Sequence, residues 1–509
     1  MFARILSAAV VGIDARAIEV QCDVAGGLPA FQIVGLPEKE VTESRERVRS
    51  ALRNAGFAFP PGRITANLAP ADMKKEGVGF DLPVAVGILV ASRQLRPPPL
   101  ETVLVGELAL DGAVRGVRGI LPMAMSAKES GATTLIVPAL NAEEAALVGG
   151  LDVIPVRSLQ EATRFLRGEL VIRTVHVDPE VLLARAHEAS PNDLRNVRGQ
   201  LQAKRALEVA AAGGHNLLLV GPPGAGKSML ARSLPGILPP LSLAEALDVT
   251  RIYSSAGLIE SGLSLVCTRP FRAPHHTISY ACMVGGGHGD PGPGEISLAH
   301  HGVLFLDETP EFDRRVLETL RQPLEERSIL LSRAGVSVRY PCSFTLVAAM
   351  NPCPCGYLGD SGRECVCGAE QVRRYRRRLS GPFLDRIDMV AEVPRLSRQE
   401  LTGRPMGEPS SAVRVRVGRA RAIQWARFAD APDVACNAHL EAADLARCCE
   451  LGAPARHLLE QAIDRYSLSA RAYVRALKVA RTIADLEGCE AMEAQHIAEA
   501  IQYRIAGEH

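Results

Sequence analysis

A glycine-rich segment, Gly221-Pro-Pro-Gly-Ala-Gly226-Lys227-Ser228, has the residue types and the spacing of a phosphate-binding loop. It follows the predicted strand 216–220, which is apolar from residue 217 onward as in a buried strand, and a helix is expected from Met229. Glycines let backbone N–H groups close around phosphate oxygens, and the helix N-terminus adds its positive dipole end. We expect the lysine to bind the β- and γ-phosphates of ATP and the serine to bind Mg²⁺. The predicted nucleotide site comprises Gly221, Pro222, Pro223, Gly224, Ala225, Gly226, Lys227 and Ser228.

Two further apolar runs end in polar residues that suit nucleotide hydrolysis. Residues 303–306 are followed by Asp307 and Glu308. A carboxylate at the C-terminal end of a strand beside the phosphate loop suits Mg²⁺, so Asp307 is predicted to serve the metal. Glu308 is predicted to orient or deprotonate the attacking water. The apolar residues 344–349 lead to Asn351, whose amide is expected to hold that water against the γ-phosphate. Together these strand ends favour ATP hydrolysis over binding alone.

Four of the twelve cysteines form two C-x-C pairs, Cys353 with Cys355 and Cys365 with Cys367. Twelve cysteines in 509 residues are too few for a disulfide scaffold. Four thiolates on one loop suit a structural, tetrahedral Zn²⁺ with no open catalytic position. The spacing is tighter than in the usual C-x₂-C knuckle. A reduced loop without metal and a redox pair therefore remain alternative interpretations.

Two segments carry side chains suited to nucleic acid. The run Arg373-Arg-Tyr-Arg-Arg-Arg378 combines cations for a phosphate backbone with a ring for base stacking. A helix face that only contacts solvent is the alternative. Arg333-Ala-Gly335 is predicted to be the tip of a hairpin and a second contact. His275 and His276 do not predict a metal site, because neighbouring residues of a strand point to opposite faces.

Composition and charge limit the class of protein. Hydrophobic residues make up 47% and charged residues 23%, as in ordinary globular proteins. The net charge of +1 excludes a uniformly basic coat for nucleic acid but permits a local basic channel. Apolar runs such as residues 85–91 are shorter than the roughly 18 residues of a membrane span. The largely apolar residues 5–13 resemble the apolar part of a signal peptide. The charged Asp14 and Arg16, however, lie at the expected cleavage site and argue against this interpretation. The sequence therefore predicts a cytoplasmic protein without membrane contact.

The pattern of strands and helices divides the chain into four parts. Residues 1–172 mix strands and helices, and the polar, proline-containing residues 173–193 indicate a linker. Residues 194–395 alternate apolar strands with longer helices, as in a parallel sheet, whereas residues 396–509 favour helices. The fold class is thus α/β, with an α+β N-terminal domain, a central parallel-sheet domain and a helical C-terminal domain. Individual elements predicted are strands 17–24, 30–34 and 134–137, helices 40–56, 412–429, 454–466 and 470–486, and a projecting loop or hairpin at 268–293.

The phosphate loop, Asp307, Glu308 and Asn351, with Asp193-Leu-Arg-Asn-Val-Arg-Gly-Gln200, resemble the motifs of AAA+ ATPases. Further runs resemble the magnesium-chelatase-like branch, and nearly the whole chain is similar to the YifB/ComM group, which includes a competence-associated DNA branch-migration helicase. Those further runs are Arg272-Ala-Pro-His-His276, residues 285–287, residues 293–297 and residues 351–356.

This resemblance implies roles for several residues. Asn351 takes the sensor-1 position, and Arg386 takes the position of an arginine finger given to a neighbouring subunit. Arg471 matches the sensor-2 arginine of the helical lid; without the resemblance it would be interpreted as a solvent-exposed helix arginine. A cation from the neighbour stabilises charge on the transferring phosphoryl group. A shared active site implies a ring, by analogy a homohexamer, and residues 268–293 correspond to the insert that lines its pore.

The N-terminal region resembles Lon-type proteases at residues 67–83 and 112–119. In that family a serine attacks and a lysine activates it. Gly79 stands at the serine position and Leu121 at the lysine position. With neither group present, the domain is expected to be a catalytically dead scaffold for ring assembly or DNA.

The sequence therefore predicts a ring-forming, Mg²⁺-dependent AAA+ ATPase that moves single-stranded or branched DNA in recombination or natural transformation. The first alternative is a metal-chelatase-type motor subunit that acts on a protein partner. The second is an ATP-dependent protease, which Gly79 and Leu121 disfavour.

Overall fold

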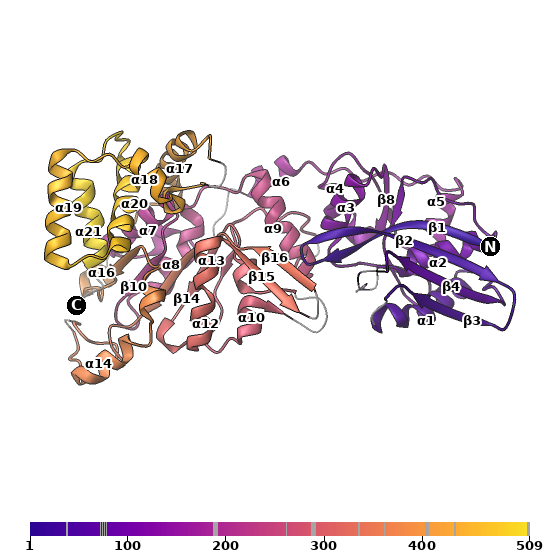
Figure 1. Ribbon diagram of the computed structural model, residues 1–509, viewed down its shortest axis with the longest axis horizontal. Coiled ribbons are helices and arrows are strands. Elements are labelled where there is room, and N and C mark those ends of the chain that lie inside the picture. Colours follow the sequence, from indigo (N-terminus) through magenta and orange to yellow (C-terminus); the bar gives the residue numbers. More distant parts are fainter. Residues whose placement is uncertain are drawn as a thin grey trace.

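The computed structural model describes residues 1–36, 39–71, 73, 75, 77, 79–186, 192–260, 262–286, 292–333, 336–360, 362–402, 407–431 and 434–505. Figure 1 shows an elongated molecule with a sheet at each side of its centre. The N-terminal sheet lies at the right, the second sheet lies nearer the middle, and the C-terminal helices lie at the left. Among the described residues, no helix combines the length and the apolar character needed to cross a membrane.

The N-terminal region is built on a seven-stranded mixed sheet in the order β3-β4-β2-β1-β5-β8-β9. Its first two strands pair antiparallel over their length, and α2 packs against both with every residue buried. The strands predicted at 17–24, 30–34 and 134–137 and the helix predicted at 40–56 are confirmed. The elements are β1 Phe2–Val11, β2 Asp14–Ala25, β3 Ala30–Val34, α1 Lys39–Asn54, β4 Arg63–Ala69, α2 Asp81–Ala91, β5 Thr102–Leu104, β6 Glu107–Leu108, β7 Val114–Arg115, α3 Ile120–Glu129, β8 Thr134–Pro138, α4 Ala142–Ala146, β9 Asp152–Val156 and α5 Leu159–Leu166.

The segment predicted to be a linker contains a helix, α6 Pro179–Ala186. Its Leu183 is buried in an apolar cluster with Leu121 of α3 and with Leu241 and Ala246 from the beginning of α9 and the turn before it. The backbone N–H of Gly119 also donates to the Ser254 carbonyl of α9. Apolar burial of this kind stabilises packing of the two regions against each other. The residues between them therefore form part of a packed interface.

The central region contains a five-stranded parallel sheet in the order β11-β14-β17-β10-β18. Its strands are short and almost fully buried, as expected where helices cover both faces. The elements are α7 Leu201–Gly213, β10 Leu217–Val220, α8 Lys227–Ile237, α9 Leu243–Ala256, β11 Phe271–Arg272, α10 Tyr280–Val284, β12 Gly285–Gly286, β13 Gly292–Pro293, α11 Glu295–Leu298, β14 Val303–Leu306, α12 Arg314–Thr319, α13 Arg321–Glu326, β15 Ser328–Arg333, β16 Val336–Pro341, β17 Thr345–Met350, α14 Ala369–Arg376, α15 Gly381–Leu384 and β18 Met389–Glu392.

Two predicted hairpins are found in this region. Residues 268–293 do not simply project, because β11 joins the sheet beside β14; only β12 and β13 form a hairpin, and residues 287–291 lie outside the described residues. Strands β15 and β16 form the second predicted hairpin, with Arg333 opposite Val336. Ala334 and Gly335 at its tip lie outside the described residues.

The C-terminal region is helical, as predicted. Helices α17 and α20 pack on α7, and α21 packs on the edge strand β18, so this region covers one side of the parallel sheet. The helices are α16 Arg398–Thr402, α17 Ser410–Arg427, α18 Ala442–Cys448, α19 Ala453–Tyr466, α20 Ala470–Glu487 and α21 Ala494–Ile505.

Candidate active site

The phosphate loop, residues 221–228, connects the end of β10 to the beginning of α8. Gly224 and Gly226 have φ values of 76° and 96°, a left-handed conformation that glycine adopts without strain. The buried Lys227 Nζ donates to the carbonyls of Gly221 and Pro222 at 2.6 and 3.0 Å. Burial lowers the pKa of Lys227, while the charges of Asp307 and Glu308 oppose that shift. The loop therefore holds a cation where phosphate oxygens would bind.

The Ser228 hydroxyl donates to Asp307 Oδ2 at 2.7 Å, which joins α8 to the end of β14. Hydroxyl and carboxylate oxygens are the hard donors that Mg²⁺ takes together with phosphate oxygens. The chemistry of this pair fits the metal that the sequence predicts. The structure thus brings together Ser228 and Asp307, which lie 79 residues apart in the chain.

Asn351 is the third predicted strand-end residue at this site. Strand β17 lies between β14 and β10, so the residue after it emerges between the carboxylates and the phosphate loop. Asn351 Oδ1 accepts a hydrogen bond from Lys227 Nζ at 3.0 Å. The three predicted strand ends therefore meet at one edge of the sheet, where parallel strands present their carboxyl ends.

Glu308 has a neighbour that the sequence did not indicate. Its backbone is left-handed, with φ 49°, and its Oε2 lies 3.6 Å from Nδ1 of His276. His276 follows β11 in a loop, and its ring lies on that of His275 with centroids 4.1 Å apart. The expectation that the two histidines point to opposite faces is wrong, because they do not belong to a strand. The run Arg272-Ala-Pro-His-His276 was the signal that could have identified this partner.

Arg386 and Arg471 lie at the other edge of the sheet. The Arg386 carbonyl accepts a hydrogen bond from the side chain of Asn216, the residue directly before β10. The phosphate loop directly follows the other end of β10, and this strand spans about 13 Å. The Arg386 guanidinium donates to Glu325 Oε1 at 2.5 Å and to the Arg321 carbonyl at 3.2 Å. Arg471, at the beginning of α20, donates to Asp385 Oδ2 at 2.9 Å. Neither arginine approaches the phosphate loop of its own chain.

The four predicted cysteine ligands converge. The Sγ atom of Cys353 lies 3.4 Å from that of Cys355 and 3.7 Å from that of Cys365, and the ligand atoms of all four cysteines lie within 4.8 Å of one another. A tetrahedron with Zn–S bonds of 2.3 Å has sulfur–sulfur edges of about 3.8 Å. The separations are far longer than a disulfide bond. The thiols of this cysteine loop therefore fit a tetrahedral metal.

Family models cover most of the chain. "Magnesium chelatase, subunit ChlI" matches residues 193–401, "Subunit ChlI of Mg-chelatase" matches residues 20–141, and "Magnesium chelatase, subunit ChlI C-terminal" matches residues 407–504. Over 509 residues the chain is 46% identical to Competence protein ComM of Haemophilus influenzae, covering 98% of this chain and 97% of that protein. This chain belongs to the magnesium-chelatase-like AAA+ family, in the YifB/ComM group.

Two further relatives are similar to this chain. YifB of Escherichia coli is 46% identical over 500 residues, which are 97% of this chain and 96% of that protein. Lon protease 2 of Bacillus subtilis is 28% identical over 160 residues, 28% of each chain. Of the two residues expected at the Lon serine and lysine positions, Gly79 and Leu121, the second is fully buried in the apolar cluster beside α9.

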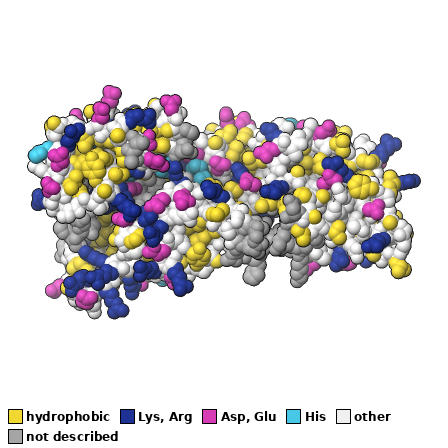
Figure 2. Space-filling view, viewed as in Figure 1, with side chains coloured by type: hydrophobic (Ala, Val, Ile, Leu, Met, Phe, Trp, Pro, Cys, Tyr) yellow, Lys and Arg dark blue, Asp and Glu magenta, His cyan; other side chains and the backbone are white. Residues whose placement is uncertain are grey.

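The predicted basic run occupies α14 and the residues that follow it. Figure 2 shows Lys and Arg side chains gathered at the lower left, where α14 lies in Figure 1. Arg373, Arg374, Arg377 and Arg378 are exposed. Tyr375 is only 7% exposed, so its ring is not free to stack on a base, and that part of the prediction is wrong.

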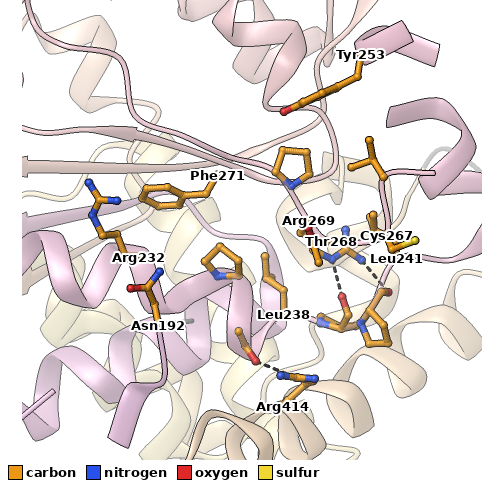
Figure 3. A pocket seen from close by; sticks show the side chains of 16 residues that line it. Asn192, Arg232, Leu238, Leu241, Tyr253, Cys267, Thr268, Arg269, Phe271 and Arg414 are labelled. Carbon is orange, nitrogen blue, oxygen red and sulfur yellow. Dashed lines mark hydrogen bonds between the residues drawn. The ribbon is translucent and has the colours of Figure 1, made fainter. Parts of the chain in front are cut away.

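A separate cavity of about 360 Å³ lies between α8, α9 and α17 (Figure 3). Arg232 lies over the ring of Phe271, and the guanidinium of Arg269 donates to the Pro239 carbonyl at 2.6 Å. Arg414 donates to the Gly236 carbonyl at 2.8 Å. The described residues that line this cavity include none of the predicted nucleotide-binding or catalytic residues, so it is distinct from the nucleotide site of this family member.

Proposed function

We propose that this chain is a Mg²⁺-dependent ATPase that assembles into a ring, by family analogy a homohexamer, and acts as a DNA motor. The observation that carries this proposal is the position of Arg386 and Arg471 at the edge of the sheet opposite the phosphate loop. A cation that stabilises the transferring phosphoryl group must approach it closely. Only a second copy can supply these cations, so hydrolysis requires assembly.

Each residue of the site has a role in this proposal. Lys227 and the backbone of residues 221–228 bind the phosphates, while Ser228 and Asp307 hold Mg²⁺, which neutralises phosphate charge when bound. Glu308 accepts the proton of the attacking water, and its contact with His276 keeps the carboxylate oriented. Asn351 positions that water.

Two observations support DNA as the substrate of the motor. The relative of 46% identity carries the name of a competence protein, and the match covers almost the entire chain. The exposed arginines around α14 present the positive charge that binds phosphate backbones without reading sequence. We therefore propose branch migration or unwinding during recombination or natural transformation, in the cytoplasm.

The cysteine loop is proposed to hold one structural Zn²⁺ through Cys353, Cys355, Cys365 and Cys367. The sulfur–sulfur separations of 3.4–3.7 Å support this assignment. Because four thiolates fill the coordination shell, the ion would stabilise the loop and take no part in hydrolysis.

A chelatase-type motor acting on a protein partner is the second candidate, since all three matching family models describe a magnesium chelatase subunit. ATPase and strand-displacement assays with no DNA, single-stranded DNA and forked DNA separate the two. DNA-stimulated hydrolysis together with movement of a branch supports the DNA motor. A rate of ATP hydrolysis that does not change when DNA is added, together with no DNA binding at low salt, would favour the chelatase-type motor.

A further inference from the structure

The guanidinium of Arg386, the cation that the proposed function assigns to a neighbouring subunit, is held by three groups of its own chain. Nε donates to the Arg321 carbonyl at 3.2 Å, Nη1 to the Pro382 carbonyl at 2.5 Å, and Nη2 to Glu325 Oε1 at 2.5 Å. The side chain of Arg386 is only 10% exposed, whereas that of Glu325 is 59% exposed. Each nitrogen of this guanidinium therefore has an acceptor before a second copy of the chain approaches.

The three acceptors differ in charge and therefore in effect. The carbonyls of Arg321 and Pro382 are neutral and belong to the backbone of α13 and α15, so they orient the guanidinium and leave its charge in place. The carboxylate of Glu325 is an anion, and hydrogen bonds between two charged groups are stronger than those between neutral groups. Its negative charge opposes the attraction of Arg386 for a phosphate. Among these three contacts, Nη2 is thus the nitrogen bound to a group of the same charge as a phosphate.

Helix α13 supplies two of the three contacts. Arg321 is its first residue and Glu325 lies four residues later, so the two residues lie one turn apart on the same side of the helix. The helix is fixed by the buried Pro323 and by an ion pair of 2.8 Å between Arg321 and Glu318 of α12. The packing of α13 therefore brings the Glu325 carboxylate to Arg386, although the Glu325 side chain itself remains largely exposed.

Arg386 can be reached from outside along a groove of about 400 Å³. The groove is lined by residues of α10, α12, α13 and β15, and both Arg386 and Glu325 belong to this lining. Ion pairs that are open to solvent contribute little to stability, so they exchange readily for another partner. An anion that enters the groove thus meets an ion pair that it can open.

We propose that Glu325 is a positioning residue that holds Arg386 in its own chain and yields it to a phosphate of the neighbouring subunit's nucleotide. The inference rests on the proposed function and adds its regulation. A phosphate oxygen and the Glu325 carboxylate are both anionic acceptors, so they compete for Nη2. When the phosphate displaces Glu325, the carbonyls of Arg321 and Pro382 keep the guanidinium oriented. Glu325 thus restrains the rate at which an assembled ring hydrolyses ATP.

The test compares Glu325→Gln with the wild type in the full-length protein. The substitution keeps the size of the side chain and removes its negative charge. Glu326→Gln is the matched control, because Glu326 is the adjacent exposed residue of α13 and accepts from Gln322 Nε2 at 2.9 Å. ATP hydrolysis is measured at saturating ATP and Mg²⁺, over protein concentrations that extend to full assembly.

We expect Glu325→Gln to hydrolyse ATP about threefold faster than the wild type, the effect expected from releasing one solvent-exposed ion pair. Its nucleotide affinity should be unchanged, because Glu325 contacts Arg386 at the edge of the sheet opposite the phosphate loop. Glu326→Gln should retain the wild-type rate. A rate of Glu325→Gln that is equal to or below the wild-type rate overturns the inference.

The double variant Glu325→Gln/Arg386→Ala separates this inference from the proposed function. It should be as inactive as Arg386→Ala, and a gain in rate that persists without Arg386 would overturn the inference. If Arg386→Ala alone hydrolyses ATP as fast as the wild type, the proposed function fails and the inference falls with it. If Arg386→Ala is inactive but Glu325→Gln is no faster than the wild type, the proposed function stands and the role of Glu325 is rejected.

Chemical modification of arginine measures the contact without hydrolysis. Phenylglyoxal reacts with accessible guanidinium groups, and mass spectrometry of the digested protein gives the rate at Arg386 alone. In the absence of nucleotide, this rate should be higher in Glu325→Gln than in the wild type and in Glu326→Gln. An equal rate in all three proteins would show that Glu325 does not hold Arg386, and would overturn the inference.

Discussion

The guanidinium of Arg471 lies 2.9 Å from Oδ2 of Asp385, the residue directly before Arg386. This ion pair joins the beginning of α20 to the segment that precedes β18. It holds Arg471 close to Arg386, so the proposed sensor-2 and finger arginines both lie at the edge of the sheet opposite the phosphate loop of their own chain. In the proposed ring, a neighbouring subunit would receive both cations together.

Lys227→Ala and Glu308→Gln should both abolish ATP hydrolysis, but in different ways. The first removes the cation that binds phosphates, so nucleotide affinity should fall strongly. The second leaves the phosphate loop intact and removes the group that accepts a proton, so ATP should remain bound. Nucleotide titration and single-turnover hydrolysis check the two effects. Normal turnover by Glu308→Gln would remove Glu308 from the catalytic role.

Mixing two inactive variants should restore hydrolysis. Lys227→Ala lacks a working phosphate loop but retains Arg386, whereas Arg386→Ala retains the loop and lacks the cation. If the arginine acts on the neighbour, some interfaces in a mixed ring combine an intact loop with an intact Arg386, and phosphate release should recover there. Arg395→Ala, which alters an exposed arginine near Asp360, serves as a control that should stay active on its own. Failure of the mixture to recover would argue against action between subunits.

Purified protein should carry about one equivalent of zinc per chain, measured by elemental analysis. The double substitution Cys355→Ser/Cys367→Ser should lose the metal and lower the thermal midpoint, because the loop packs on the phosphate loop at Gly356 and Pro223. Cys267→Ser and Cys282→Ser, which lie outside the cluster, should keep the zinc content. Metal-free wild-type protein with ordinary stability and activity would contradict the zinc assignment.

Replacing Arg373, Arg374, Arg376 and Arg377 by Ala should weaken DNA binding across all sequences and flatten its dependence on salt. Each lost contact with a single strand should reduce the slope of log K against log salt by about 0.7. Fluorescence anisotropy at several salt concentrations measures this slope. Arg314→Ala and Arg315→Ala, which remove two exposed arginines of α12, serve as controls for the loss of positive charge elsewhere on the surface. An unchanged slope would leave the α14 arginines as solvent-exposed residues only.

Much of the nucleotide site could be predicted because its signals are local. A strand, a glycine turn and a helix follow one another within residues 216–237, and the backbone conformation of such a unit depends on neighbouring residues. The carboxylates and the asparagine also follow apolar runs directly. Parallel strands present their carboxyl ends at one edge, so identifying the strands was enough to bring Lys227, Ser228, Asp307 and Asn351 together.

The sequence by itself thus determined the three-part α/β architecture, the phosphate loop, the strand-end carboxylates and the cysteine cluster. Only the tertiary structure decided that His276 lies beside Glu308, that Tyr375 is buried, and that Arg386 and Arg471 lie at the far edge of the sheet. The tertiary structure also decided that α6 packs against α9, although the sequence of α6 predicts a linker. These relationships depend on strand order and on packing between segments distant in the chain, and neither periodicity nor motif spacing specifies such contacts.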